Sequence, residues 1–162
     1  MSEAFYDRFG KKHYPDDGQA FPRRAAYAVV VREGKVLLTA KPRGDCWEFP
    51  GGGVDRGDDV RSCLYRELFE ESGYDIELGR GEQEVRQTIN FFADYIRPAG
   101  EFWHYDQIFC LYDGRQYGFE FKEGIWKTPE NGSARWTDLE VLRSGNIPIN
   151  YCHKRAFEQF NF

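Results

Sequence analysis

The stretch WEFPGGGVDRGDDVRSCLYRELFEESGY, residues 47–74, decides how this chain folds. Its first half contains three consecutive glycines, Gly51 to Gly53, and glycine allows backbone angles and close approaches that other residues do not. Its second half predicts a single helix from about Asp58 to the residue before Gly73. Asp58 or Asp59 can accept the unpaired amide protons of the first turn, and Gly73 can adopt the left-handed conformation that ends a helix.

Three glutamates project from one face of this helix within about one turn, at the spacing i, i+3 and i+4: Glu67, Glu70 and Glu71. They lie in the last turns, where the helix dipole favours cations, and like charges at this spacing repel by about 0.2–0.5 kcal/mol per pair. The acidic face overlaps the edge of an apolar stripe formed by Val60, Leu64 and Leu68, which predicts partial burial of the acids. Carboxylate oxygens are the ligands that Mg²⁺ takes, so the pattern indicates a divalent-cation site.

These residues resemble the signature of the Nudix hydrolase family, in which a Gly, five residues, a Glu and seven further residues precede Arg-Glu-aliphatic-x-Glu-Glu-x-Gly-aliphatic. Gly52 opens the match, and residues 66–74 (RELFEESGY) close it. Asp58 stands where glutamate is usual and Tyr74 where the last aliphatic residue is usual, and neither departure removes a core carboxylate. Many positions are fixed at set spacing, so the match is specific. The preceding segment WEFPGG, residues 47–52, resembles MutT-type (d)NTP pyrophosphohydrolases.

The resemblance implies hydrolysis of a phosphoanhydride bond in a nucleoside diphosphate linked to another group, X. It implies Mg²⁺ as the cofactor, with Mn²⁺ as an alternative, because metal ions neutralise phosphate oxygens and activate water. By resemblance, Glu67, Glu70 and Glu71 are the metal ligands and base candidates, and a carbonyl of Gly51 or a neighbour is a further ligand. Glu70 and Glu71 are favoured as direct ligands, and Glu67 is expected to hold a second metal or act as the base.

Two further residues are expected to support the metal site. Arg66 can pair with Glu70 at i, i+4 and fix its rotamer, which makes it a catalytic positioning residue. Family members often add an acid from a downstream loop, and Glu130 is the candidate here, with Glu120 and Glu123 as rivals. Asp58 is expected to cap the helix first and to support the metal ligands second.

Candidate substrate contacts lie before and within the glycine stretch. Lys41 and Arg43 can steer or clamp anionic groups of the substrate, although an ordinary charged loop explains them equally well. Gly52 and Gly53 allow the backbone to approach a ligand, and Trp47 precedes them. Aromatic residues downstream can stack on a nucleobase but are more often core residues on strands: Phe91, Phe92, Phe102, Trp103 and Tyr105. His104 and His153 are lone histidines that are expected to be structural.

Several functions remain open at this point. A (d)NTP pyrophosphohydrolase of the MutT type is one, and a dinucleoside polyphosphate or ADP-ribose/nucleotide-sugar hydrolase is another in the same class. An alternative from a different class is a Nudix module that binds a nucleotide to sense it without cleaving it. Such modules usually lose one or more of the acids, so the presence of all three beside Arg66 favours catalysis.

Strands are expected on both sides of the central stretch. The run AAYAVVVREGKVLLTAKP, residues 25–42, predicts two strands with a turn at residues 32–35. The continuous apolar run Val29 to Val31 is typical of a strand buried on both faces. Further strands are expected at residues 84–97, 101–112 and 116–126.

Two helices are expected after these strands. Trp136 to Val141 predict the start of one, with Thr137 and Glu140 as a capping box and Trp136 packing on Val141. A final helix is predicted at roughly residues 150–160. The strand pattern indicates an α/β or α+β protein, and the resemblance implies an α/β/α sandwich around a mixed β-sheet. At 162 residues, we expect an N-terminal extension at residues 1–22 and one domain at residues 23–162.

The composition of the chain limits the kinds of partner that we expect it to bind. A net charge of −5 argues against a general nucleic-acid-binding surface, so a small nucleotide and no nucleic-acid polymer is the expected partner. The four cysteines are far apart and form no CxxC pair, which favours free thiols in a reducing compartment. No apolar run approaches the length of a membrane span. We therefore expect a soluble cytoplasmic protein, either a monomer or a homodimer, with no membrane partner.

Overall fold

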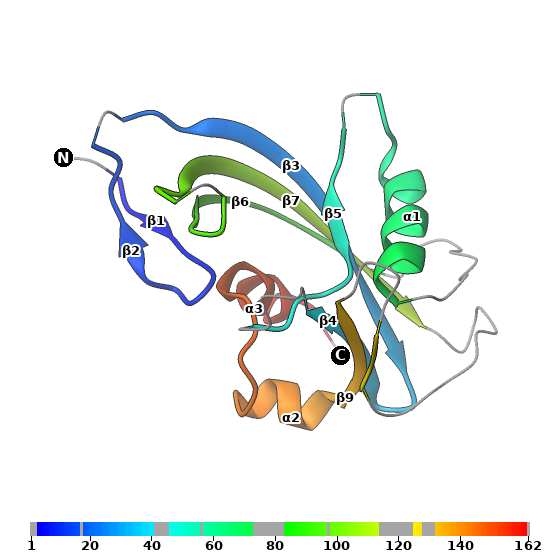
Figure 1. Ribbon diagram of the computed structural model, residues 1–162. Coiled ribbons are helices and arrows are strands. Elements are labelled where there is room, and N and C mark those ends of the chain that lie inside the picture. The colour runs from blue at the N-terminus through cyan, green and yellow to red at the C-terminus, as the bar shows by residue number, and fades with distance from the viewer. Residues whose placement is uncertain are drawn as a thin grey trace.

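The computed structural model describes residues 3–16, 18–40, 46–55, 57–72, 83–96, 98–113, 125–127 and 132–161 (Figure 1). The strands are β1 (Phe5–Tyr6), β2 (Lys12–His13), β3 (Phe21–Arg32), β4 (Lys35–Ala40), β5 (Gly51–Gly53), β6 (Gln83–Ala93), β7 (Glu101–Asp113), β8 (Ile125–Lys127) and β9 (Ser133–Asp138). The helices are α1 (Val60–Ser72), α2 (Leu139–Ser144) and α3 (Tyr151–Phe157). The strands form one sheet in the order β2-β1-β6-β7-β3-β4-β9-β8, with β5 beside β3.

Strand β3 lies at the centre of the sheet and makes it mixed. It pairs in parallel with β7 from Phe21 to Val31, and antiparallel with β5 at residues 25–27 and with β4 at residues 31–32. Val29 and Val30 are completely buried, as expected for a strand that is covered on both faces. The two strands predicted at residues 25–42 are therefore confirmed, and β3 begins earlier than expected, at Phe21.

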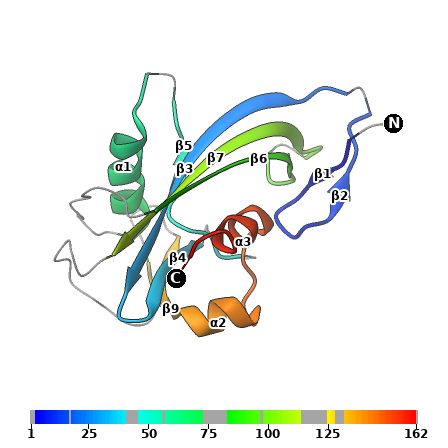
Figure 2. The same cartoon turned by 180° about the vertical axis from the view of Figure 1, so that it is seen from behind.

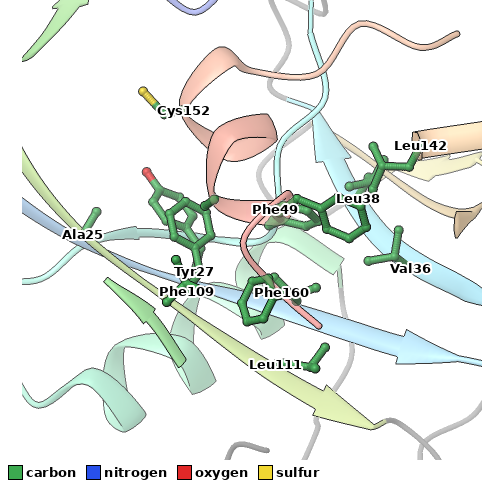
Figure 3. Close-up of a cluster of buried hydrophobic side chains, with 14 of the residues drawn as sticks. Ala25, Tyr27, Val36, Leu38, Phe49, Phe109, Leu111, Leu142, Cys152 and Phe160 are labelled. Atoms are coloured by element: carbon green, nitrogen blue, oxygen red, sulfur yellow. The ribbon is translucent and has the colours of Figure 1, made fainter. Parts of the chain in front are cut away.

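Helices cover both faces of the sheet, which confirms the expected α/β/α arrangement around a mixed sheet. On one face, α1 packs against β3 through a buried cluster that includes Cys63, Leu64, Leu68, Ala26, Ala28 and Val30. On the other face, α2 and α3 close a second cluster, in which Phe49, Phe109, Phe157 and Phe160 are buried (Figure 3). Figures 1 and 2 show α1 on one side of the central strands and α2 with α3 on the other.

Helix α1 forms where the sequence predicts it. The Asp59 carboxylate accepts a hydrogen bond of 2.8 Å from the Ser62 amide, so the second of the two candidate residues caps the helix. Leu64 and Leu68 are buried, and Val60 packs against them at the edge of the cluster. The role expected of Gly73 in ending the helix falls outside the described residues.

The strands that follow α1 agree with the prediction, and the helix start predicted after them does not. Strands β6 and β7 correspond to the predicted segments 84–97 and 101–112, and they form an antiparallel pair. Of the strand expected at residues 116–126, the structure describes Ile125 and Trp126, which begin β8. The capping box is wrong, because Trp136 and Thr137 belong to β9, which pairs with β4, and α2 begins only at Leu139. Burial of Trp136 between sheet and α1 outweighs the local helix signal.

Helix α3 and the N-terminal residues complete the second face. Asn150 caps α3, since its side chain accepts a hydrogen bond from the Cys152 amide. Strand β1 adds to the sheet through one parallel pairing, Tyr6 with Phe91 of β6, and β2 pairs antiparallel with β1. The N-terminal extension therefore docks on the sheet.

Two sequence expectations about chemistry and membranes can be compared with the structure. All four cysteines are free and buried, as the absence of a CxxC pair predicts. Burial raises the pKa of the Cys63 thiol to about 11, so this thiol stays protonated at neutral pH. Within the described ranges, no helix has both the length and the apolar composition to cross a membrane.

Candidate active site

Strand β5 and the acidic face of α1 lie against each other. The Gly51 amide donates a hydrogen bond of 3.0 Å to Glu71 Oε2, and the Glu71 side chain is 4% exposed. A buried carboxylate needs such a donor because burial of an unpaired charge is costly. This contact fixes the position of the glycine strand relative to the last turns of α1.

Two glycines of this strand are required for different reasons. A Cβ atom on Gly52 would lie 2.8 Å from Glu67 Oε1, so the absence of a side chain lets Glu67 approach the strand. A Cβ atom on Gly51 would collide with the backbone oxygen of Ala26, because β5 pairs closely with β3 there. Gly51 also has a φ of 153°, a conformation that favours glycine. Gly51 therefore shapes the fold, and Gly52 shapes the site.

Arg66 links the start of α1 to one of the acids. Its Nη1 lies 3.3 Å from Asp58 Oδ2, and its Nη2 lies 3.6 Å from Glu67 Oε1. The predicted pairing of Arg66 with Glu70 is wrong. Side chains on a helix point back toward its N-terminus, so Arg66 reaches Asp58 more easily than a residue one turn ahead. Arg66 thus holds Glu67 in position and leaves Glu70 without a described partner.

The donor atoms at this junction suit a hard divalent cation. Glu67 and Glu71 face Gly52 and Gly51, and Glu70 is partly exposed one turn from Glu67. Within the described ranges, no three His, Cys, Asp or Glu side chains are gathered closely enough to hold a metal by themselves. Mg²⁺ keeps several waters and is usually held by one or two carboxylates together with substrate phosphates, so the donor set fits it.

Several predicted site residues cannot be placed. The described residues do not include Lys41, Arg43 or Glu130, nor the rivals Glu120 and Glu123, nor Tyr74. Trp47 is described, and its amide donates to the Pro148 oxygen while its carbonyl accepts from the Asn150 amide. Its partly buried side chain packs against the core cluster on the α3 face. Trp47 therefore anchors the chain before α3, and its expected contact with substrate stays a prediction.

Arg23 is a candidate substrate contact that the sequence reading did not identify. Its guanidinium lies 4.6 Å from the centre of the Trp103 ring, and its Nη2 lies 3.7 Å from where a Cβ atom of Gly53 would be. The side chain is exposed and forms no ion pair or hydrogen bond with the residues that the structure describes. An unpaired cation beside the glycine strand can bind an anionic ligand. The sequence predicts this strand only from residue 25, so it does not place Arg23 beside the glycine strand. The earlier start of β3, at Phe21, is the one signal that could have indicated this role.

Three polar side chains, those of Glu48, Asn150 and His153, lie together on the α3 face of the sheet, beside the chain that leads into β5. Asn150 Nδ2 donates to Glu48 Oε2 at 2.9 Å, and Glu48 Oε2 lies 3.6 Å from His153 Nε2. The Phe49 amide donates to His153 Nδ1, which requires that nitrogen to be unprotonated. Burial lowers the pKa of His153 to about 3, so the ring is neutral at physiological pH. His153 is therefore structural, as expected, and locks α3 to the chain that leads into β5.

The aromatic residues predicted on β6 and β7 are mostly core residues. Phe91, Trp103 and Tyr105 are buried, and the Tyr105 hydroxyl lies 2.6 Å from the Tyr27 hydroxyl. Burial raises the pKa of Tyr27 and of Tyr105, so both hydroxyls stay protonated and share a hydrogen bond. For the buried rings, the interpretation as core residues is therefore better supported than stacking on a nucleobase.

A polar cavity of about 420 Å³ lies on the α1 face of the sheet. Val54, which follows β5, and Val60, which begins α1, line the cavity together with Arg24, Thr88 and Asp106, among others. Arg24 follows Arg23 on β3, so the two side chains point to opposite faces of the sheet. The cavity on the α1 face and the surface around Arg23 are therefore separate, and each borders the glycine strand.

The chain resembles known proteins over most of its length. The NUDIX domain profile matches residues 21–160. An RNA pyrophosphohydrolase of Dinoroseobacter shibae is 37% identical over 150 residues, which span 89% of this chain and 79% of that protein. An 8-oxo-dGTP diphosphatase of Buchnera aphidicola subsp. Acyrthosiphon pisum is 33% identical over 131 residues, 75% of this chain and 98% of that protein. In three further RNA pyrophosphohydrolases, the match spans only 44%, 64% and 33% of the relative's length.

Solved structures agree on the fold. A MutT NUDIX hydrolase from Burkholderia pseudomallei superposes with a TM-score of 0.56 at 24% identity, over 86% of this chain and 98% of that one. A MutT protein from Methanosarcina mazei Go1 gives a TM-score of 0.59 at 20% identity, over 87% and 94%. At such identities the likeness establishes the fold alone.

Proposed function

The chain belongs to the NUDIX domain family, and from that membership we propose that it is a Mg²⁺-dependent pyrophosphohydrolase. Its substrate is a nucleoside diphosphate linked to another group, X, and water cleaves one phosphoanhydride bond. The observation that carries the proposal is the contact of two glutamates with two consecutive glycines, Glu71 with Gly51 and Glu67 with Gly52. A chain selected for stability alone would not place these acids together at the end of a helix.

The residues of the site have different proposed roles. Glu70, Glu71 and a carbonyl of Gly51 are the proposed metal ligands, and Glu67 either holds a second metal or takes the proton of the attacking water. The bound cation supplies charge neutralisation at the phosphate oxygens. A new bond forms between the water oxygen and phosphorus, the bond to the bridging oxygen breaks, and the leaving phosphate carries the negative charge. Arg66 holds the Glu67 carboxylate at the face of Gly52.

Two kinds of substrate have support for the same site. The match to the 8-oxo-dGTP diphosphatase spans nearly all of that protein, which supports a (d)NTP of the MutT type. The match to the Dinoroseobacter shibae RNA pyrophosphohydrolase is longer and more identical, which supports a triphosphate at an RNA 5′ end, in contrast to the expectation of no nucleic-acid polymer as a partner. Dinucleoside polyphosphates and nucleotide sugars belong to the same panel of test substrates.

The test is phosphate or pyrophosphate release from this panel, with Mg²⁺ and with EDTA. We expect turnover that requires Mg²⁺, and we expect Glu70→Gln to lower kcat by at least about 100-fold, because a ligand is lost while the fold is retained. Glu140→Gln is the matched control, since Glu140 is a helical glutamate on α2 that pairs with Arg143 away from the site.

Two outcomes would contradict the proposal. Unchanged turnover in Glu70→Gln would remove Glu70 from the metal ligands. A wild-type protein that hydrolyses nothing in the panel, yet binds a nucleotide equally well in EDTA, would instead be a nucleotide-sensing module.

A further inference from the structure

The cavity on the α1 face of the sheet lies away from the proposed catalytic acids. Its volume of about 420 Å³ is within the range of pockets that hold small ligands. Val60, which lines the cavity, begins α1, and Glu67 follows about 10 Å further along the helix axis. Val54 and Val60 pack against the buried α1-face cluster, and Ile108 of that cluster is 8% exposed. The apolar part of the cavity is therefore formed by side chains that the core holds in place.

A polar row crosses three paired strands at this cavity. Thr88 of β6 pairs with Asp106 of β7, and Asp106 pairs with Arg24 of β3, so the three side chains lie on one face of the sheet. Ile108 and Ala26, which follow two residues further along their strands, belong to the α1-face cluster and place the row on that face. The Thr88 hydroxyl donates a hydrogen bond of 2.7 Å to Asp106 Oδ1. The Asp106 carboxylate is therefore bonded to the neighbour on its β6 side.

Two cations line the cavity beside this row. Arg24 is exposed and, among the residues that the structure describes, forms no hydrogen bond or ion pair. Arg86 lies two residues before Thr88 on the same face, and its Nε donates to Glu84 Oε2 at 3.0 Å. Of the described charged residues that line the cavity, two are therefore arginines and one is Asp106. The lining carries an excess positive charge, and Arg24 is its cation that lacks a described carboxylate partner.

We propose that this cavity binds a small organic anion, whose phosphate or carboxylate group pairs with Arg24 while its apolar part packs on Val54 and Val60. A guanidinium binds either group through charge-assisted hydrogen bonds, often two in parallel. Arg86 adds a second positive charge, and clefts lined by one sign of charge concentrate ions of the opposite sign. Asp106 opposes the anion, and its hydrogen bond from Thr88 competes with pairing to Arg24. The site lies on the opposite face of the sheet from Arg23 and is separate from the proposed catalytic acids.

The test uses phenyl phosphate and benzoate, which combine an apolar ring with a phosphate or a carboxylate and so distinguish the two sources of the charge. Binding is followed by methyl NMR of the full chain in EDTA, with benzyl alcohol as the uncharged comparison. We expect saturable shifts of the Val54, Val60 and Ile108 methyl signals at millimolar concentrations of at least one anion. Benzyl alcohol should bind at least about fivefold more weakly, because it lacks the group that pairs with Arg24.

Three variants test the contacts that the proposal assigns. Arg24→Ala should weaken binding about tenfold, because it removes a charge-assisted hydrogen bond. Arg23→Ala is the matched control, since this adjacent arginine points to the opposite face of β3, and it should leave the affinity unchanged. Asp106→Asn should instead tighten binding about fivefold, because it removes a negative charge beside the anion and keeps the size of the side chain.

Three outcomes would overturn the inference. One is the absence of saturable shifts at the three methyl groups with either anion. Another is an equal loss of affinity in Arg23→Ala and Arg24→Ala, which would place the anion elsewhere. The third is weaker binding in Asp106→Asn, a nearly isosteric variant that keeps the test decisive if Arg24→Ala fails to fold. The measurement uses no turnover, so its result does not depend on the proposed hydrolase activity.

Discussion

At the scale of single residues, adjacent positions of β5 serve opposite purposes. Gly51 lacks a side chain because the backbone of β3 occupies that space, whereas Gly52 lacks one because the Glu67 carboxylate does. A backbone neighbour cannot move without disturbing the sheet, while the end of a flexible side chain can. The same substitution should therefore damage stability at one position and activity at the other.

We expect Gly51→Ala to lower the free energy of unfolding by about 3 kcal/mol or more, because the new methyl meets the Ala26 carbonyl in a strained conformation. Gly52→Ala should change stability by less than about 1 kcal/mol but displace Glu67 and lower kcat by about 100-fold. Urea unfolding and steady-state kinetics on both variants check this. Equal losses of stability in the two variants would refute the division of roles.

At the scale of elements, the start of α3 connects the helix to the chain before β5. Asn150 is 4% exposed, and its side chain makes two hydrogen bonds, one from the Cys152 amide that caps the helix and one to Glu48. Trp47 is joined to the same residue through its carbonyl. The position of the glycine strand thus depends on a helix that follows it by about a hundred residues.

Substitutions at Asn150 should separate these two hydrogen bonds. Asn150→Ala loses both and should lower the free energy of unfolding by about 2 kcal/mol, whereas Asn150→Ser keeps a capping oxygen and should lose less. Chemical denaturation gives the order wild type, Ser, Ala. If the Ser and Ala variants were equally stable, the cap would contribute nothing and the Glu48 contact would account for the loss.

At the scale of the whole molecule, the α3 face is closed around a neutral histidine. His153, on α3, packs against the Tyr27 and Phe49 rings, and its Nδ1 accepts a hydrogen bond from the Phe49 amide. Glu48 is the carboxylate that approaches it, at 3.6 Å, and burial nevertheless lowers the pKa of His153 to about 3. Protonation of this ring therefore opposes folding of the entire domain.

The pH dependence of stability follows from this shift. An unfolded histidine binds a proton below its ordinary pKa of 6.5, whereas the folded one does so only near 3. Stability from this residue is thus fully present above pH 6.5 and is lost as the pH falls toward 3, by up to about 1.4 kcal/mol per pH unit. His153→Gln should be less stable at pH 7.5 but show a shallower decline between pH 6.5 and 4.5 in urea titrations. Parallel declines in the two proteins would exclude His153 as the cause.

The sequence by itself was enough to predict the family, the acidic helix after the glycine stretch, and the strands β3, β4, β6 and β7. These features are encoded in local spacing, since capping, periodicity and the placement of acids all act within a few turns of chain. The same local rules failed at Trp136 and Thr137, because pairing of β9 with β4 and burial against α1 outweigh a capping signal.

Only the tertiary structure decided which glycine contacts which acid, that Arg66 turns back to Asp58, and that Arg23 borders the site. It also brought the N-terminal turn beside Tyr95 and the start of α3, through contacts between residues far apart in the sequence. Such contacts depend on how the sheet twists and how side chains fill the space between layers, and no local pattern encodes that. The acidic helix and its glycine stretch were therefore readable from the sequence, while the contacts between them emerged from packing.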